Sequence, residues 1–296
     1  MPVLKETSQP EASVLRAKRR APMWLWLSLP IAALAMAGSA AGILLESVYS
    51  KETANWTAQA ITTDIVNVGV AYPALLLLAF FASRGSLRAY LAWTGVLAYS
   101  VYSYSIYAFS IHFGPLFLIY VAVLGMSVYA LVGGLVSLDP NRVKASFNSR
   151  APVRSTSTLL IALGTAFYLL WLSAIIPATL DSTTPQELVE TGLASNPVHV
   201  LDMAVFLPAM VLAGVLLAKG RSLGYVLAST VLGAAILFSL GIVGLQPVLA
   251  GRGEMPVWGL AVGIGIVTAV ELLVLFRFLG SVDSDADLTR ASTGGG

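Results

Sequence analysis

Apolar residues in this chain fall into long runs that are separated by short polar segments. A helix needs about 20 mostly apolar residues to cross the roughly 30 Å of hydrocarbon in a bilayer. The runs that are long enough are residues 23–45, 64–82, 87–109, 115–138, 157–179, 199–218, 222–245 and 256–279. The pattern therefore predicts an all-α polytopic membrane protein with eight transmembrane helices.

Basic residues are concentrated on one side of this predicted topology. If the N-terminus is cytoplasmic and the spans alternate, 15 of the 17 Lys and Arg residues fall in cytoplasmic segments, and only Lys51 and Arg252 do not. The 180–198 loop, on the outer side, has three acidic residues and no base. Because cytoplasmic loops carry an excess of Lys and Arg, we expect both the N- and C-termini to be cytoplasmic.

The spans form two groups of four that are joined by a basic segment. We expect a cytoplasmic N-terminal tail at 1–22, a first four-helix repeat at 23–138, a basic cytoplasmic linker at 139–156, a second four-helix repeat at 157–279 and a disordered C-terminal tail at 280–296. The first span begins with basic residues and contains small residues, as a cleaved signal peptide does. Its apolar core exceeds the roughly 7–15 residues of a signal peptide, which favours retention.

The composition indicates that lipid is the main solvent of this chain. It is 57% hydrophobic and only 11% charged, whereas soluble domains carry about 25% charged residues. The absence of cysteine excludes disulfides and thiolate chemistry, and no P-loop, GxGxxG or HExxH motif occurs. We predict a multi-pass protein of the cell (plasma or inner) membrane with no cofactor and no nucleic-acid partner. Whether it forms a homo-oligomer stays open.

An internal repeat is suggested when the chain is aligned with itself at a shift of 135 residues. Residues 21–85 then fall on 156–220 without gaps, and after one inserted residue the match continues. The special residues that coincide are Glu46 with Asp181, Ser47 with Ser182, Glu52 with Glu187, Pro73 with Pro208 and Gly85 with Gly220. Four spans per unit is an even number, so the two copies would be parallel repeats about an axis along the membrane normal.

The matched prolines predict helix breaks at corresponding positions of the two repeats. Pro73 and Pro208 each lie about ten residues from the outer end of the predicted helix, roughly 15 Å deep at 1.5 Å per residue. Interrupted helices in corresponding places of two halves point to the binding site of a transporter. The alternative is that proline is simply more frequent in membrane helices than in soluble ones.

Polar pairs occupy matched positions on the outer side of these prolines. Asp64 falls on His199 and Asn67 falls on Asp202, and each pair is spaced i, i+3 on one helical face. Because a charge inside the membrane normally faces the bundle interior, we expect Asp202 to be paired, with His199 as its partner. One hypothesis is a proton- or cation-responsive site that opens outward. The alternative is that these residues cap the first turn of a helix.

The third span is unusually polar, because tyrosine alternates with serine over residues 99–110. Buried hydroxyls need hydrogen-bond partners, so some of these side chains must face protein or water. We predict that Tyr99 and Tyr102 form part of the wall of an outward-facing polar vestibule, with His112 at its rim. Ordinary helix packing with interhelical hydrogen bonds is the alternative.

Glu271 lies alone in the inner third of the last span, and an intramembrane carboxylate is a functional hypothesis by default. We expect it to act as an inner-side relay to Asp202, or else to hydrogen-bond a neighbouring Ser or Tyr. The small-residue pairs Gly38/Gly42 and Gly259/Gly263 predict close contacts between helices.

These features favour a small secondary transporter or permease, with a site between the two repeats near the bilayer midplane. Asp202, His199, Asp64 and Asn67 would line the outer route to that site. A membrane-embedded redox or metal- or haem-binding enzyme that uses His112 and His199 is a second hypothesis. A sensor or scaffold without turnover is a third. The metal, if there is one, and the substrate cannot be named from the sequence.

Overall fold

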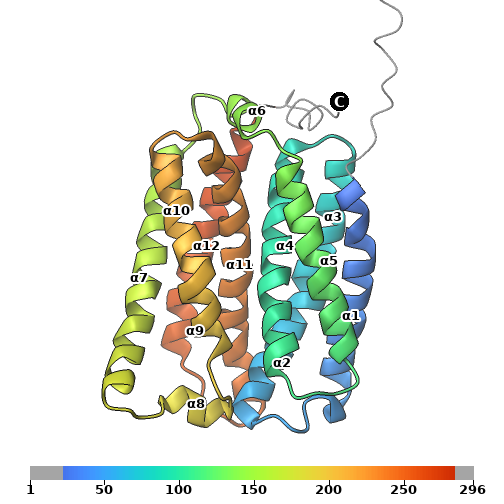
Figure 1. Cartoon of the computed structure of the whole chain (residues 1–296), viewed down its shortest axis with the longest axis vertical. Helices are drawn as coiled ribbons and strands as arrows, with labels where there is room; N and C mark the ends of the chain where they lie inside the picture. The colour runs from blue at the N-terminus through green and yellow to red at the C-terminus, as the bar shows by residue number, and fades with distance from the viewer. Residues whose placement is uncertain (1–22, 284–296) are drawn as a thin grey trace, which may run out of the picture.

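The computed structural model describes residues 23–283, which form a bundle of long helices (Figure 1). Within this range there is no strand, and the one isolated bridge pairs Phe147 with Val282. The chain is a multi-pass helical membrane protein, as the sequence predicts. The predicted N-terminal tail, and all but the first residues of the predicted C-terminal tail, lie outside the described residues.

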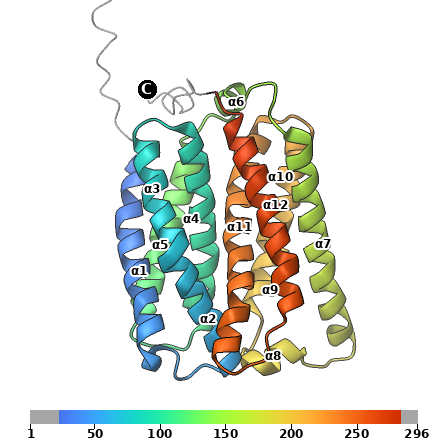
Figure 2. The same ribbon diagram turned by 180° about the vertical axis from the view of Figure 1, so that it is seen from behind.

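The helices follow one another with short connections. In chain order they are α1 (Ser28–Leu44), α2 (Ala54–Val66), α3 (Tyr72–Ser83), α4 (Leu87–Ser110), α5 (Phe117–Val136), α6 (Pro140–Ala145), α7 (Val153–Leu180), α8 (Gln186–Thr191), α9 (Pro197–Leu201), α10 (Leu207–Ala218), α11 (Ser222–Gly251) and α12 (Trp258–Gly280). A short 3₁₀ helix, η2 (Met23–Leu27), precedes α1, and another, η3 (Glu46–Val48), follows it. Figures 1 and 2 show α6 at one end of the bundle and α8 at the other.

Seven helical segments of the described chain are long and apolar enough to cross a membrane. They are Met23–Leu44, Ala54–Ser83, Phe117–Val136, Val153–Leu180, Pro197–Ala218, Ser222–Gly251 and Trp258–Gly280. The predicted span at 87–109 is also a helix, α4, but its tyrosines and serines make it too polar for this criterion. Figures 1 and 2 show α4 running the length of the bundle between its neighbours.

The second span begins ten residues earlier than the sequence pattern predicts. Thr53 caps α2, since its hydroxyl accepts a hydrogen bond from the Trp56 amide at 3.2 Å. The first turns of α2 are polar, so an apolar run could not reveal them. As a result, Pro73 lies 19 residues from the start of its helical segment, Ala54–Ser83, rather than about ten. Each of the two prolines lies ten residues before the end of its own segment.

The helices do not break at Pro73 and Pro208, because each proline follows a π-helical turn. These turns are η4 (Asn67–Ala71), between α2 and α3, and η5 (Asp202–Phe206), between α9 and α10. After them the Tyr72 amide donates to the Asn67 carbonyl and the Leu207 amide donates to the Asp202 carbonyl. A proline removes one intrahelical hydrogen bond and crowds the preceding turn. The π-helical turn contains one extra residue, and the helix continues past the proline.

Two groups of helices lie side by side, α1–α5 in one and α7–α12 in the other, and α4 and α11 face each other between them (Figures 1 and 2). The backbones approach closely where Gly95 of α4 meets Gly233 of α11. A Cβ on Gly95 would lie 2.9 Å from the Gly233 Cα. Beside this crossing, the Thr94 and Thr230 hydroxyls share a hydrogen bond of 2.8 Å. Glycine is required here because only a missing side chain permits such an approach.

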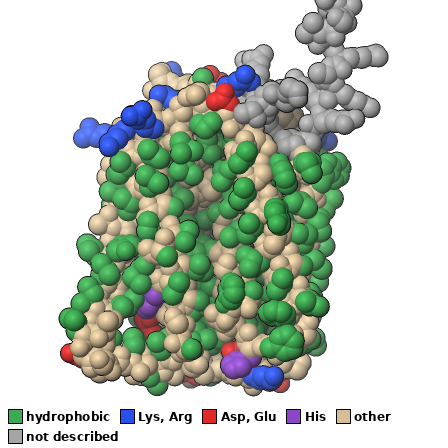
Figure 3. Space-filling model, in the orientation of Figure 1, with side chains coloured by type: hydrophobic (Ala, Val, Ile, Leu, Met, Phe, Trp, Pro, Cys, Tyr) green, Lys and Arg blue, Asp and Glu red, His purple; other side chains and the backbone are tan. Residues whose placement is uncertain are grey.

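Lys and Arg side chains gather at the α6 end of the bundle (Figure 3). The Lys144 ammonium, just inside the end of α6, donates to the Gly220 carbonyl at 2.6 Å. Arg88 of α4 donates to the Val282 carbonyl. The basic linker that the sequence predicts therefore contains a short helix, which is tied to the turn before α11.

Only one of the two predicted small-residue contacts forms. Gly38 and Gly42 are buried, and a Cβ on either would touch a neighbouring element. Gly259 and Gly263 of α12 have open space around them, so that prediction was wrong. Most of α12 faces outward, where lipid replaces a helix neighbour and sequence spacing carries no information about which face is covered.

Candidate functional site

A cavity of about 570 Å³ lies between α2, α4, α7, α9–α10, α11 and α12. At the α8 end it reaches the exposed side chains of Glu187 and Glu190. Figure 3 shows a hollow toward this end of the molecule, with histidine and acidic side chains beside it. The cavity therefore opens at the end opposite α6 and extends into the bundle.

Five of the residues singled out from the sequence line this cavity, namely Tyr99, Tyr102, His199, Asp202 and Glu271. Neither of the two prolines is among its lining residues. Pro208 acts instead through the π-helical turn before it, since Asp202 and Phe206 are the first and last residues of η5 and both face the cavity. π-helical turns are frequent at functional sites.

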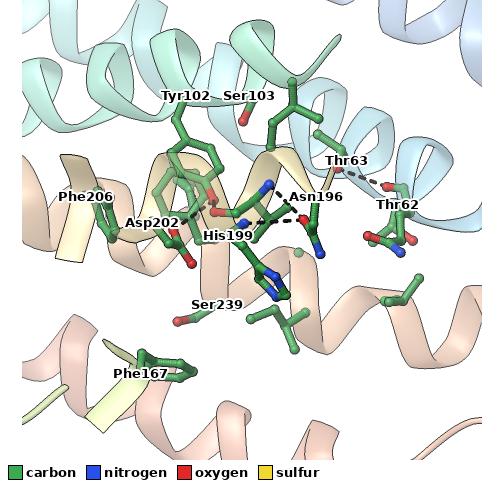
Figure 4. A pocket seen from close by; sticks show the side chains of 18 of the residues that line it. Thr62, Thr63, Tyr102, Ser103, Phe167, Asn196, His199, Asp202, Phe206 and Ser239 are labelled. Carbon is green, nitrogen blue, oxygen red and sulfur yellow. Dashed lines mark hydrogen bonds between the residues drawn. The ribbon is translucent and has the colours of Figure 1, made fainter. Parts of the chain in front are cut away.

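Asp202 is held between two helices by neutral donors. Its Oδ1 accepts a hydrogen bond of 2.8 Å from the Tyr102 hydroxyl of α4 (Figure 4). Its Oδ2 accepts one of 2.8 Å from the indole Nε1 of Trp171 on α7. These bonds orient the carboxylate, but neither donor supplies a compensating charge. No Lys or Arg is among the described residues that line the cavity.

His199 is not the hydrogen-bond partner of Asp202 that the sequence suggested. Its ring packs on that of Trp171, with the centroids 4.3 Å apart. Its Nε2 lies 3.2 Å from Glu187 Oε2 but outside hydrogen-bond geometry, so no hydrogen bond joins the two side chains. The capping interpretation was also wrong, because Asn196 caps α9 by accepting from the Val198 and His199 amides.

Glu271 reaches the same cavity from α12 at a greater depth. It is 2% exposed, and its Oε2 accepts a hydrogen bond of 3.0 Å from the Ser239 hydroxyl. Glu271 lies 13 residues from the start of α12, about 20 Å along the helix, whereas Asp202 lies about 8 Å from the start of α9. Both helices begin at the α8 end, so the cavity holds two carboxylates about 12 Å apart in depth.

Asp64 does not face the cavity and lies inside the first group of helices, 2% exposed. The Tyr49 hydroxyl donates to its Oδ2 at 2.7 Å, and the Tyr107 hydroxyl donates to its Oδ1 at 2.8 Å. Burial, and the nearby carboxylate, raise the pKa of Tyr49 well above its usual value of 10. Tyr49 therefore remains a protonated donor, and both carboxylate oxygens of Asp64 are occupied.

Asn67 belongs to the same enclosed network and is fully buried. Its amide nitrogen donates to the Ser39 hydroxyl at 3.1 Å, and its amide oxygen accepts from Tyr99 at 3.0 Å. Tyr99 and Tyr107 line the cavity with part of their surface while their hydroxyls point to the buried network. The tyrosine-rich face of α4 thus separates two polar sites that the sequence placed on one route.

The two histidines lie in different surroundings. His112 is exposed, outside the cavity lining, and its Nδ1 lies 3.0 Å from Glu52 Oε1. Among residues 23–283, no group of three or more His, Cys, Asp or Glu side chains is arranged to hold a metal ion. The described part of the cavity therefore presents carboxylates without a ready set of metal ligands.

Trp171 is the main cavity residue that the sequence analysis missed. It lies nine residues before the end of α7, roughly 14 Å inside the helical segment. Tryptophan prefers the membrane interface, so one at this depth is a signal that its N–H has a specific acceptor. Ser239 of α11, which binds Glu271, carries no comparable signal in a helix rich in small residues.

Comparison with known proteins gives no relative from which a function could be transferred. No protein-family model, no curated protein and no solved structure matches the chain.

Proposed function

We propose that the protein is a small secondary transporter whose substrate binds in the cavity between α4, α7, α11 and α12. The observation that carries the proposal is the pair of carboxylates, Asp202 and Glu271, in one cavity with no Lys or Arg among its described lining residues. A charge inside a membrane is costly and marks a substrate, ion or proton pathway. Two carboxylates at different depths would give a coupling ion two successive binding sites along the pathway.

The proposed architecture is eight spans in two parallel four-helix repeats, with α4 as the third span and both termini cytoplasmic. Support comes from local features that recur after 135 residues: η4 and η5 have the same length, and α3 and α10 end at matched residues. Gly85 and Gly220 follow them, and both have left-handed backbones. The gathering of basic side chains at the α6 end supports a cytoplasmic assignment of that end.

The contact between the two repeats gives the proposal a mechanism. After the one-residue insertion, Thr94 corresponds to Thr230, so their shared hydrogen bond lies where an axis relating the repeats would pass. Alternating access then consists of a small rocking of α7–α12 against α1–α5 about the α4–α11 contact. The cavity faces the outer side in the present arrangement, and Glu271 is the group that a rocked arrangement presents inward.

The test is proton- or cation-dependent uptake into proteoliposomes that contain the purified protein. We expect a substrate panel to show flux driven by an imposed gradient, and Asp202→Asn to lower it at least tenfold. Glu254→Gln is the matched control, because it removes an exposed carboxylate outside the cavity at the same end of the bundle. The proposal is wrong if no panel member shows flux, or if Asp202→Asn leaves the flux at the wild-type level.

The competing hypotheses give different results in cheap measurements. A haem enzyme that uses His112 and His199 would show a Soret band in the optical spectrum of the purified protein, and a metal enzyme would bring its metal through purification. A sensor or scaffold would bind a ligand in the cavity but show no flux in any gradient. Each of these outcomes replaces the transporter proposal with a defined alternative.

A further inference from the structure

We propose that the ligand of the cavity is a hydrophobic organic cation: a molecule with one positive charge on an aromatic or aliphatic body. The inference names the substrate class of the proposed transporter and rests on that proposal for its transport consequence. The inference that such a cation binds rests on the lining of the cavity and does not require transport. The evidence is the charge of the lining, the aromatic side chains around Asp202 and the shape of the space.

The charges that line the cavity have one sign. Its side chains include Asp202, Glu271, Glu187 and Glu190, a single histidine, and no Lys or Arg among the described residues. Glu271 is the deepest of these carboxylates. Its Oε2 accepts from Ser239, and in the described part of the chain no hydrogen bond reaches its Oε1. A buried carboxylate is stabilised in its charged form by a positive partner, and a bound cation would be that partner in this lining.

Aromatic side chains bind Asp202 and line the cavity beside it. Tyr102 and Phe238 have ring centroids 4.3 Å apart, and Phe206 packs against Phe238 at 4.9 Å with the planes perpendicular. Trp171 approaches from the opposite helix with its N–H on Asp202. Aromatic faces attract cations, tryptophan most strongly, and the attraction grows when the site is desolvated. The carboxylate and the rings therefore select the same charge.

Most of the remaining lining surface is apolar, and the cavity has the size of a small organic molecule. Leu163, Leu170, Leu245, Leu260 and Ile264 supply aliphatic wall from three helices. A volume of about 570 Å³ falls within the range of about 300–1,000 Å³ that is typical of sites for small organic molecules. A bare metal ion would find no three-ligand group here, and an anion would meet the carboxylates. In a cation with an apolar body, the charge complements the carboxylates and the body packs against the apolar wall.

The experiment uses a pair of probes that share a shape and differ in charge. Radiolabelled tetraphenylphosphonium and tetraphenylborate are each equilibrated with the full-length protein in detergent. Only the saturable fraction is counted, after subtraction of binding to empty micelles. We expect saturable binding of tetraphenylphosphonium, and binding of tetraphenylborate that is at least tenfold weaker. This comparison needs no variant, so a folding defect cannot obscure it.

Two isosteric variants then locate the site. Asp202→Asn and Glu271→Gln each remove one charge and keep the size of the side chain, and we expect each to weaken tetraphenylphosphonium binding by about tenfold or more. Glu254→Gln, outside the cavity, is expected to leave the affinity unchanged. The thermal unfolding midpoint of every variant is recorded alongside, so that loss of affinity is scored only for folded protein.

The outcomes separate this inference from the transport proposal. Saturable cation binding that both variants weaken, without flux in proteoliposomes, supports the ligand class and refutes transport. Gradient-driven uptake of other solutes, without saturable tetraphenylphosphonium binding, refutes the ligand class and leaves transport standing. Equal binding of the two probes also overturns the inference, because the site would then recognise shape and not charge.

Discussion

Replacement of Gly42 by alanine tests whether Asp64 is a structural residue of the first group of helices, α1–α5. An added Cβ would lie 2.2 Å from Asp64 Oδ2 and 2.7 Å from the Tyr49 hydroxyl oxygen. The carboxylate must retreat by about 1 Å to restore ordinary van der Waals contact. That movement breaks or lengthens its bonds from Tyr49 and Tyr107, which are 2.7 and 2.8 Å long. Gly38→Ala is the matched control one turn away, since its Cβ would meet only the Cγ2 methyl of Ile119, at 3.3 Å.

The magnitude follows from the bonds at risk. A hydrogen bond to a charged group is worth about 1.5–3 kcal/mol, and alanine returns up to about 1 kcal/mol through its higher helix propensity. A net loss of about 2–4 kcal/mol is expected if most of both bonds is lost. At about 2–4 °C per kcal/mol for a chain of 150–250 residues, this corresponds to a fall in Tm of roughly 4–16 °C. Gly38→Ala should stay within about 2 °C of the wild type.

The assay is the apparent Tm of the full-length protein in detergent, measured at one scan rate because membrane proteins commonly unfold irreversibly. Equal Tm values for Gly42→Ala and Gly38→Ala would refute the reasoning, since Asp64 could then not be held against Gly42. A low Tm for Gly42→Ala with unchanged binding of the cation probe would add that Asp64 stabilises the fold without taking part in ligand binding.

Three further predictions address the packing, the topology and the cavity. Gly95→Ala should cost about 1–3 kcal/mol because its Cβ meets backbone. Gly241→Ala, with open space around it, should not lower the Tm; similar Tm values for the two variants would argue against the close crossing. The chain has no cysteine, so single cysteines can be introduced as labels. Arg252→Cys should react with an impermeant thiol reagent in intact cells, and Lys219→Cys should react only after permeabilisation. The reverse pattern would show that the topology is opposite to the one proposed. Tyr102→Phe should destabilise the fold by about 0.6 kcal/mol and by no more than about 1.7 kcal/mol, the average and the maximum measured for interhelical hydrogen bonds in a membrane protein; an unchanged apparent Tm would mean that its bond to the cavity aspartate contributes nothing.

The spans could be predicted because lipid imposes a simple rule on the sequence. Each crossing must be a helix of sufficient apolar length, so the runs locate the helices directly. The rule fails where a helix faces protein or water. The start of α2, at Ala54, and the polar α4 both illustrate this, since their hydrogen-bonding side chains are matched by neighbours that the linear sequence does not identify.

The local geometry of the candidate site could also be predicted, but its partners could not. The i, i+3 spacing placed His199 and Asp202 near one another on one element. Which groups bind the carboxylate was decided by α4 and α7, which bring Tyr102 and Trp171 to it from positions 100 and 31 residues away. Long-range side-chain contacts depend on how helices rotate and cross, and a single apolar sequence constrains that weakly.

The two matched polar pairs lie in different surroundings, and this difference separates what the sequence determined from what the tertiary structure decided. The self-alignment equated the pair at Asp64 with the pair at His199, and the π-helical turns recur at the matched positions. The first pair is nevertheless enclosed, because Ser39 and Tyr49 fill the space around it with hydroxyl groups. Their counterparts at a shift of 135 residues are Ala174 and Thr184, which give the second pair no such donors. Sequence set the backbone pattern through proline and apolar length; side-chain packing between distant helices left one site filled and the other open.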